Sequence, residues 1–158
     1  MTKPRKSARE KLMANHGLPK VVAIPPKMQK RFGKGKMLVP SPILIDRAVR
    51  KVKKGKLITP SLIRQMLAKE FKADTCCPLT TGIFLRICAE AAEEELTSGK
   101  KQITPWWRVV KDNGELLEKF PSATEKQTKR LKAEGFEIIE HRGKTYIKNF
   151  GQFLITKF

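Results

Sequence analysis

The most distinctive residues of the sequence are its two tryptophans, which are adjacent and are followed by an arginine. Trp106, Trp107 and Arg108 lie within residues 103–110. In extended backbone, neighbouring side chains point to opposite faces, so we expect one indole to pack inward and the other to line a surface or pocket. An exposed indole can stack on a nucleic-acid base, with a gain of roughly 1–3 kcal/mol per base. The alternative is a core strand with an aromatic anchor, continued by the β-branched residues 109–110.

The cysteines and histidines do not form a pattern that predicts catalysis. His16 and His141 lie far apart, and the three cysteines lack a CxxC pair, so no metal site is predicted. We interpret the adjacent Cys76 and Cys77 as packing beneath a helix pair, with a reactive thiol as the alternative. The sequence also contains no phosphate loop and no Ser/His/Asp constellation. We therefore predict no enzyme activity, no cofactor and no metal.

Positive charge is concentrated in the first part of the chain. The formal net charge is +19, and residues 1–58 hold 17 of the 34 lysines and arginines but only two acidic residues. Such a charge favours a polyanionic partner, most simply nucleic acid. We predict a basic, partly flexible arm at residues 1–37 and a folded domain at residues 38–158. Within it, we expect residues 1–19 to be a mobile tail, with a short helix across residues 8–14 as the alternative. We expect residues 20–37 to be an extended basic segment laid over the domain, with a solvated linker as the alternative.

The location and the oligomeric state follow from composition. No apolar run approaches the roughly 20 residues that a membrane span needs. Three cysteines, two of them adjacent, do not suggest a disulfide framework, so we expect a reducing, cytoplasmic and nucleoid-associated protein. High positive charge disfavours self-association, which predicts a monomer.

A helix-turn-helix pattern stands in the middle of the chain. Residues 59–71 and 80–95 carry apolar side chains at helical spacing, and a short loop separates the two segments. Thr80 or Thr81 is the expected cap of the second helix. The N-terminal half of such a helix can enter a DNA groove. We predict DNA contacts from Thr80, Thr81 and Arg86, because the glutamates of residues 90–95, interpreted as a solvated face, would repel phosphate.

The remaining elements are short. A helix is predicted from residue 41 to about 54, and a further one at residues 125–134. Small β elements are expected at four places, namely residues 56–58, 109–110, 136–147 as a hairpin, and 154–155. The predicted fold class is therefore mainly α with small β elements.

From residue 53 to residue 138, the order of features resembles the DNA-binding domain of alkylguanine-DNA alkyltransferases. It is closer still to their non-enzymatic relatives, the alkyltransferase-like proteins. The family's active-site motif, Pro-Cys-His-Arg-Val, corresponds here to Pro-Trp-Trp-Arg-Val at residues 105–109. Residues 54–59, 110–114 and 131–135 resemble the family's approach to its first recognition-motif helix, its turn after the motif and its closing helix. The resemblance implies a winged helix-turn-helix at residues 38–158.

The departures from the family pattern concern the reactive residues. In the enzymes, the motif cysteine accepts the alkyl group and a neighbouring histidine and a glutamate activate it. Trp106 and Trp107 stand at the cysteine and histidine positions, and an indole has no ionisable nucleophile. Glu134 stands at the glutamate position and is expected to hydrogen-bond an indole N–H. Thr59 and Thr81 stand where the family has a tyrosine and an intercalating arginine.

The resemblance implies a protein that binds duplex DNA, recognises alkylated guanine by base flipping and flags it for nucleotide excision repair proteins, without alkyl transfer. The implied lesion-pocket residues are Trp106, Trp107, Arg108 and Thr59. Further DNA contacts are expected from Lys53, Lys54 and Lys56. Loss of the tyrosine and the arginine favours the alternative, which is a general nucleic-acid-binding or architectural protein with no lesion specificity, on DNA or RNA.

Overall fold

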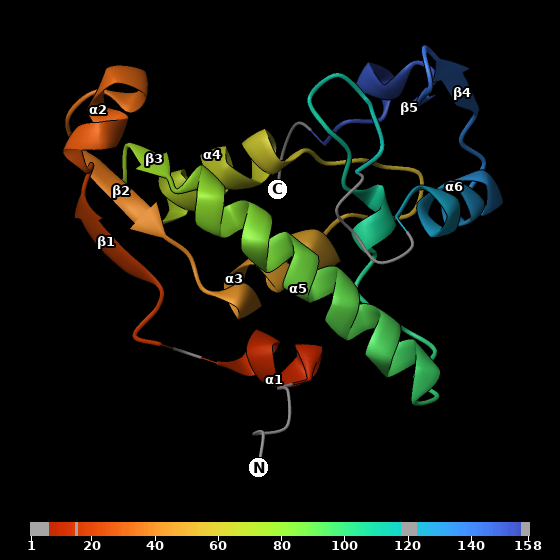
Figure 1. The fold of residues 1–158 in the computed structure, drawn as a ribbon, viewed down its shortest axis with the longest axis horizontal. Coiled ribbons are helices and arrows are strands. Elements are labelled where there is room, and N and C mark those ends of the chain that lie inside the picture. The colour runs from red at the N-terminus through yellow and green to blue at the C-terminus, as the bar shows by residue number, and fades with distance from the viewer. Residues whose placement is uncertain (1–6, 15, 118–122, 156–158) are drawn as a thin grey trace.

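Helix α5 (Pro78–Thr97) runs through the middle of the molecule, and the other elements are arranged around it (Figure 1). The computed structural model describes residues 7–14, 16–117 and 123–155. Helices α3 (Pro42–Arg50) and α4 (Pro60–Glu70) pack against α5 and build the main apolar core with it. The fold is mainly helical with small sheets, as predicted. Within the described residues, no helix is both long enough and apolar enough to span a membrane.

Helices α3 and α4 begin with the same local signal. Ser41 and Thr59 lie in extended backbone directly before a proline. Their hydroxyl oxygens accept hydrogen bonds of 3.2 Å from the N–H groups of Leu44 and Leu62. A hydroxyl cap followed by proline satisfies one free N–H and fixes the backbone of the first turn.

Helix α5 begins earlier than predicted, at Pro78, and neither Thr80 nor Thr81 is its N-cap. Thr81 is fully buried, and its hydroxyl donates a hydrogen bond of 2.7 Å to the carbonyl of Cys77. Proline suits the first turn of a helix, where an N–H would have no partner inside the helix. The prediction that Thr80 or Thr81 caps the helix is therefore wrong.

A three-stranded sheet is attached to the turn between α4 and α5. Strand β3 (Thr75–Cys76) lies in that turn and pairs in parallel with β2 (Lys36–Val39), which pairs antiparallel with β1 (Lys20–Ala23). Helix α2 (Pro26–Phe32) connects β1 to β2. The predicted boundary after residue 37 therefore divides a strand. Residues 20–37 are part of the fold and not an extended arm laid over it.

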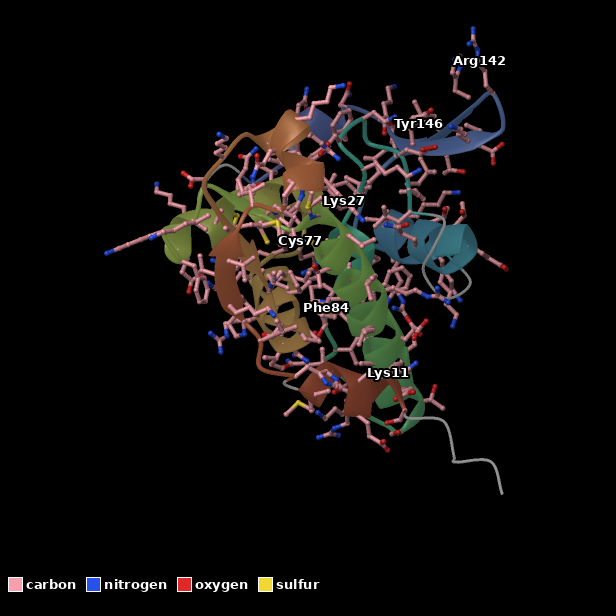
Figure 2. The ribbon with its side chains drawn as sticks, turned by 60° about the vertical axis from the view of Figure 1, so that its left-hand side comes forward. Lys11, Lys27, Cys77, Phe84, Arg142 and Tyr146 are labelled. Atoms are coloured by element: carbon pink, nitrogen blue, oxygen red, sulfur yellow. The ribbon has the colours of Figure 1, made fainter. Side chains whose placement is uncertain are left out.

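The described part of the N-terminal segment contains helix α1 (Ala8–Met13), which was the alternative to a mobile tail. Ala8 and Leu12 are buried against α5. The Glu94 side chain accepts a hydrogen bond of 2.8 Å from the N–H of Ala8. Figure 2 shows Lys11 of α1 and Cys77 near opposite ends of α5. Residues 1–6 and 15, also part of the predicted arm, lie outside the described residues.

The C-terminal part forms a second, smaller apolar cluster. Helix α6 (Ala123–Ala133) is followed by the hairpin of β4 (Ile138–His141) and β5 (Lys144–Ile147), and by the short 3-10 helix η2 (Phe150–Gln152). Arg142 lies at the tip of this hairpin (Figure 2). The predicted strands at residues 56–58, 109–110 and 154–155 are present only as isolated parallel bridges, Ile58 to Val109 and Leu57 to Leu154.

Candidate nucleic-acid interface

The Trp-Trp-Arg stretch forms a 3-10 helix, η1 (Trp106–Arg108), and not the extended strand that was expected. One indole nevertheless faces inward: Trp106 is 1% exposed, whereas Trp107 is half-buried. With three residues per turn, successive side chains diverge by about 120°. The two ring centroids are 6.3 Å apart and the ring planes meet at 81°, an edge-to-face geometry that aromatic pairs favour. Of the two indoles, Trp107 therefore has the ring surface that a ligand can contact.

Glu93 of α5 fixes the buried indole. Trp106 Nε1 donates a hydrogen bond of 2.9 Å to Glu93 Oε1, and Arg130 of α6 donates one of 3.0 Å to Oε2. Burial by itself would raise the pKa of Glu93, but the hydrogen bonds from Arg130 and Trp106 outweigh it, and the pKa lies below its ordinary value of 4.5. The carboxylate is therefore ionised at neutral pH and links η1, α5 and α6.

Glu134 holds the indole of Trp107 by a hydrogen bond, as Glu93 holds that of Trp106. Trp107 Nε1 donates a hydrogen bond of 3.0 Å to Glu134 Oε2, which confirms the role expected for this glutamate. Arg108 pairs with the same carboxylate at 2.7 Å, and its Nη1 donates a hydrogen bond of 2.6 Å to the carbonyl of Val52. The Arg108 and Glu134 side chains are only 13% and 10% exposed. Such a nearly buried, multiply bonded pair sets the orientation of the indole.

The guanidinium of Arg130 lies over both indoles. Its central carbon is 4.8 Å from the ring centroid of Trp107 and 5.6 Å from that of Trp106. Arg108 approaches the Trp107 ring at 5.6 Å. A cation within about 6 Å of an indole face is attracted by the ring. The site formed by Trp106, Trp107, Glu93, Arg130 and Glu134, here called the indole site, is therefore rigid and carries cations beside its half-exposed ring.

The N-terminal half of α5 presents an exposed face. Leu79 is 72% exposed and Ile83 is 49% exposed, and Arg86 is exposed one turn further on. Positions 79, 83, 86, 90 and 93 are three or four residues apart, so they form one stripe along the helix. The last of them, Glu93, holds Trp106. With a rise of 1.5 Å per residue, Arg86 and Glu93 are about 10 Å apart along the axis, so one ligand can reach both.

Two of the predicted contact residues are buried. Thr59 is 3% exposed and its hydroxyl caps α4, and the hydroxyl of Thr81 is bonded inside the first turn of α5. Neither hydroxyl faces a groove or a base, which corrects both predictions. Thr80 is half-buried, and Arg86 is exposed and paired with Glu90 at 2.9 Å. An exposed pair contributes about 1 kcal/mol or less, so a phosphate can replace it.

The structure brings the predicted lysines close to the Trp-Trp-Arg motif. Lys53, Lys54 and Lys56 are exposed on the loop between α3 and α4. Arg108 binds the carbonyl of Val52 at the start of this loop, and Ile58 at its end pairs with Val109. Arg86 lies on the α5 stripe that ends at Glu93, whereas Thr80 lies on α5 outside that stripe.

Sequence reasoning missed Glu93 and Arg130 and misinterpreted the acidic run. Glu93 binds Trp106, Glu94 binds the first turn of α1, and Glu95 lies 3.8 Å from Arg50. Glu93 and Glu95 are therefore structural and not part of a solvated face, whereas Glu94 is exposed although it also binds α1. Each partner is far away in the sequence, so no local pattern marks the pairs. The one local signal is that positions 93 and 86 share a helical stripe.

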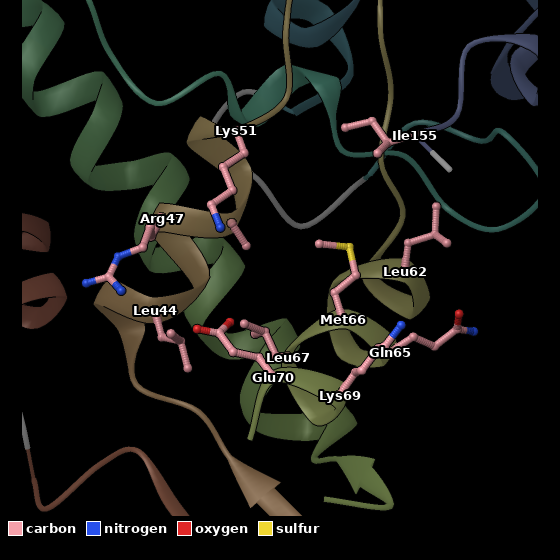
Figure 3. Close-up of a pocket in the computed structure, with 11 residues that line it drawn as sticks. Leu44, Arg47, Lys51, Leu62, Gln65, Met66, Leu67, Lys69, Glu70 and Ile155 are labelled. Carbon is pink, nitrogen blue, oxygen red and sulfur yellow. The ribbon is translucent and has the colours of Figure 1, made fainter. Parts of the chain in front are cut away.

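A groove of about 680 Å³ lies between α3 and α4 (Figure 3). Leu44, Leu62 and Met66 give it an apolar wall, and Arg47 and Lys69 contribute cations. None of the predicted lesion-pocket residues lines it. The groove is therefore distinct from the indole site.

Gly82 is exposed on the face of α5 that carries Ile83 and Arg86. A Cβ atom built at this position meets nothing within 4 Å, so packing does not require glycine. Replacing a mid-helix glycine by alanine gains roughly 0.5–1 kcal/mol. We expect Gly82→Ala to raise the free energy of unfolding in urea by this amount. For a helix that enters a DNA groove, the added methyl group would also weaken duplex binding, because it would separate the helix from DNA. A variant that is more stable but binds DNA like wild type would exclude close contact at this position.

Two helices joined by the short segment of residues 71–77, with a hairpin at the end of the domain, define a winged helix-turn-helix fold of the kind found in DNA-binding proteins. The chain has the fold of the Schizosaccharomyces pombe alkyltransferase-like protein Atl1, whose crystal structure contains damaged DNA with O6-carboxymethylguanine. This match covers 73% of the present chain and 94% of the other, with a TM-score of 0.51 and 21% sequence identity. A crystal structure of S. pombe ATL with DNA matches over the same shares, with a TM-score of 0.47 and 19% identity. No protein-family model matches the chain, and no curated protein matches its sequence.

Proposed function

We propose that the protein binds duplex DNA, recognises alkylated guanine by base flipping and flags the lesion for nucleotide excision repair, without transferring the alkyl group. The observation that carries the proposal is the fold shared with Atl1, which was crystallised with DNA containing O6-carboxymethylguanine. We also propose that the protein is a monomer in the cytoplasm and is associated with the nucleoid. The formal charge of +19 supports a polyanionic partner.

The proposed DNA interface combines α5 with the lysine loop. The exposed face of α5, formed by Leu79, Ile83 and Arg86, enters a groove. The exposed cations at positions 53, 54 and 56 contact phosphates, which position the protein without reading sequence. Both surfaces lead to the indole site, because α5 carries Glu93 and the loop is bound by Arg108. A nucleotide displaced from the duplex beside α5 therefore meets Trp107 first.

Trp107 is the proposed platform for the displaced base. It is half-buried, its N–H is engaged by Glu134, and guanidinium groups lie over its ring, so it has one fixed orientation. A fixed aromatic surface binds a base at low entropic cost. Trp106 supports this platform from the core by its edge-to-face contact.

The absence of alkyl transfer is proposed from the chemistry of the residues present. Trp106, at the position of the enzymes' cysteine, offers an indole N–H that is already bonded to Glu93 and is not a nucleophile. Burial raises the pKa of the Cys76 thiol and raises that of Cys88 well above its ordinary range. Because the thiolate is the reactive form of cysteine, buried neutral thiols are poor acceptors of an alkyl group.

One observation favours a second candidate, a general nucleic-acid-binding or architectural protein. Trp106 is buried, and both indole N–H groups have partners inside the protein. Tryptophans used in this way are core residues, and the interface would then read only phosphates and groove shape. This candidate predicts equal affinity for damaged and undamaged duplexes.

An equilibrium titration separates the two candidates. One duplex is compared with the same duplex carrying a single O6-methylguanine, at two salt concentrations, and the mass of the protein is recorded after incubation. We expect tighter binding of the damaged duplex at both salt concentrations and an unchanged protein mass. Equal affinities would support the architectural candidate, and a gain of one methyl group in mass would exclude a binding-only role.

A further inference from the structure

The segment from β1 to the start of β2 presents a strongly basic surface. Residues 20–36 contain six lysines or arginines and no acidic residue. All six side chains are exposed, and among the described residues none of them forms an ion pair. This surface, here called the basic module, is formed by Lys20, Lys27, Lys30, Arg31, Lys34 and Lys36.

The basic module is rigidly attached to the turn of the helix-turn-helix. Cys77, directly before α5, donates its N–H to the carbonyl of Leu38 at 2.9 Å. The N–H of Asp74 donates to the carbonyl of Lys36 at 2.9 Å, and the N–H of Lys36 donates back to Asp74 Oδ2 at 2.8 Å. The module therefore has a fixed position beside the N-terminal end of α5.

A small apolar cluster holds α2 on this sheet. Ile24, Met37 and Cys77 are buried together, and Met28 and Phe32 of α2 pack on them. Gly35 allows the close approach to the turn, because a Cβ atom there would overlap the Asp74 side chain. The apolar side of α2 is thus already occupied, which disfavours a membrane surface as the partner, since membrane-binding helices bury their apolar face in lipid.

We propose that the basic module binds the DNA phosphate backbone and extends the interface beyond the α5 face. Lys27, Lys30 and Arg31 are three and four residues apart on α2, so they project from one side of the helix. Unpaired, exposed cations release counterions when they meet phosphates, and this release drives sequence-independent binding. Cys77, whose N–H is bonded to Leu38 of β2, lies two residues before the exposed Leu79, so a duplex on the α5 face lies close to the module. It contributes affinity equally to damaged and undamaged DNA.

The test uses two triple variants with the same change in net charge. Lys27→Gln/Lys30→Gln/Lys34→Gln removes cations from the basic module. Lys11→Gln/Lys100→Gln/Lys101→Gln removes exposed cations near the C-terminal end of α5, which is about 30 Å long. Affinity for the undamaged duplex is measured at several salt concentrations, with circular dichroism as a check of folding.

We expect the module variant to reduce the slope of log K against log salt by about 0.9 for each phosphate that a lysine no longer neutralises, hence by up to about 2.7 for three phosphates. The control variant should change the slope much less, and the preference for the damaged duplex should be the same in both variants. Equal slopes in the two variants would overturn the inference. The inference rests on the proposed duplex binding. A wild-type protein that binds no duplex would therefore overturn both the proposed function and this inference. Equal slopes in two variants that still bind duplex would overturn the inference alone.

Discussion

Trp106→Ala is expected to lower the free energy of unfolding by about 3–5 kcal/mol, as is usual when a large buried aromatic side chain is removed from a core. Trp106 is 1% exposed and belongs to the main apolar core. The substitution also leaves Glu93, held beside Arg130, without its indole donor. Urea unfolding measures the loss directly.

Two further variants serve as controls for Trp106→Ala. Ile83→Ala removes apolar volume from a side chain that is 49% exposed, and such surface changes cost about 0.5 kcal/mol or less. Trp106→Phe keeps a ring in the core and is expected to lose less than the alanine variant. A loss below about 1 kcal/mol for Trp106→Ala would contradict a core role for this indole.

Glu134→Ala is the second change with a large expected effect. Removing one partner of a buried ion pair costs about 3–5 kcal/mol, because the other charge is left without compensation. Here the remaining charge is Arg108, 13% exposed, and Trp107 loses its acceptor as well. Glu134→Gln keeps an acceptor oxygen for Trp107 and should lose less stability.

Glu137→Ala is the matched control on the neighbouring segment. Glu137 pairs with Lys148 at 3.5 Å, but its side chain is 73% exposed, and exposed pairs contribute about 1 kcal/mol or less. We expect Glu134→Ala to lose clearly more stability than Glu137→Ala in thermal or urea unfolding. Similar losses would mean that the Glu134 carboxylate is screened by solvent and does not organise the indole site.

The sequence predicts elements whose signals are local. Ser41 and Thr59, each followed by proline, mark helix starts that the structure contains. Arg142 and Gly143 form a turn in which both residues have positive φ, which is typical of tight hairpins, and the hairpin was expected there. In each case the deciding interaction lies within a few residues.

Interactions between distant residues were not predictable in this way. The sheet that joins β2 to the turn before α5 pairs residues 37–38 with residues 75–76, and α1 is tied to Glu94 at the far end of α5. Nothing in the basic N-terminal sequence distinguishes a strand that pairs from an arm that does not. These residues become neighbours only in the folded state, when the long helix α5 and the packing of α3 and α4 bring them together.

The indole site shows the same limit. The expectation that one indole is buried is confirmed, although the backbone is a 3-10 helix and not a strand. The bond between Glu134 and an indole was expected from the family resemblance and is present. Glu93 and Arg130 were missed, because a carboxylate within a run of glutamates gives no sign of which one faces the core.

The proposed recognition of the lesion at Trp107 is tested most directly by the ratio of affinities for damaged and undamaged duplex in Trp107→Leu and Trp107→Phe. Leucine keeps apolar packing but removes the aromatic face, whereas phenylalanine keeps a ring that stacks on a base. We expect wild type and Trp107→Phe to prefer the O6-methylguanine duplex and Trp107→Leu to bind both duplexes equally, with all three proteins folded. A preference that survives unchanged in Trp107→Leu, or that is absent from wild type, would contradict it.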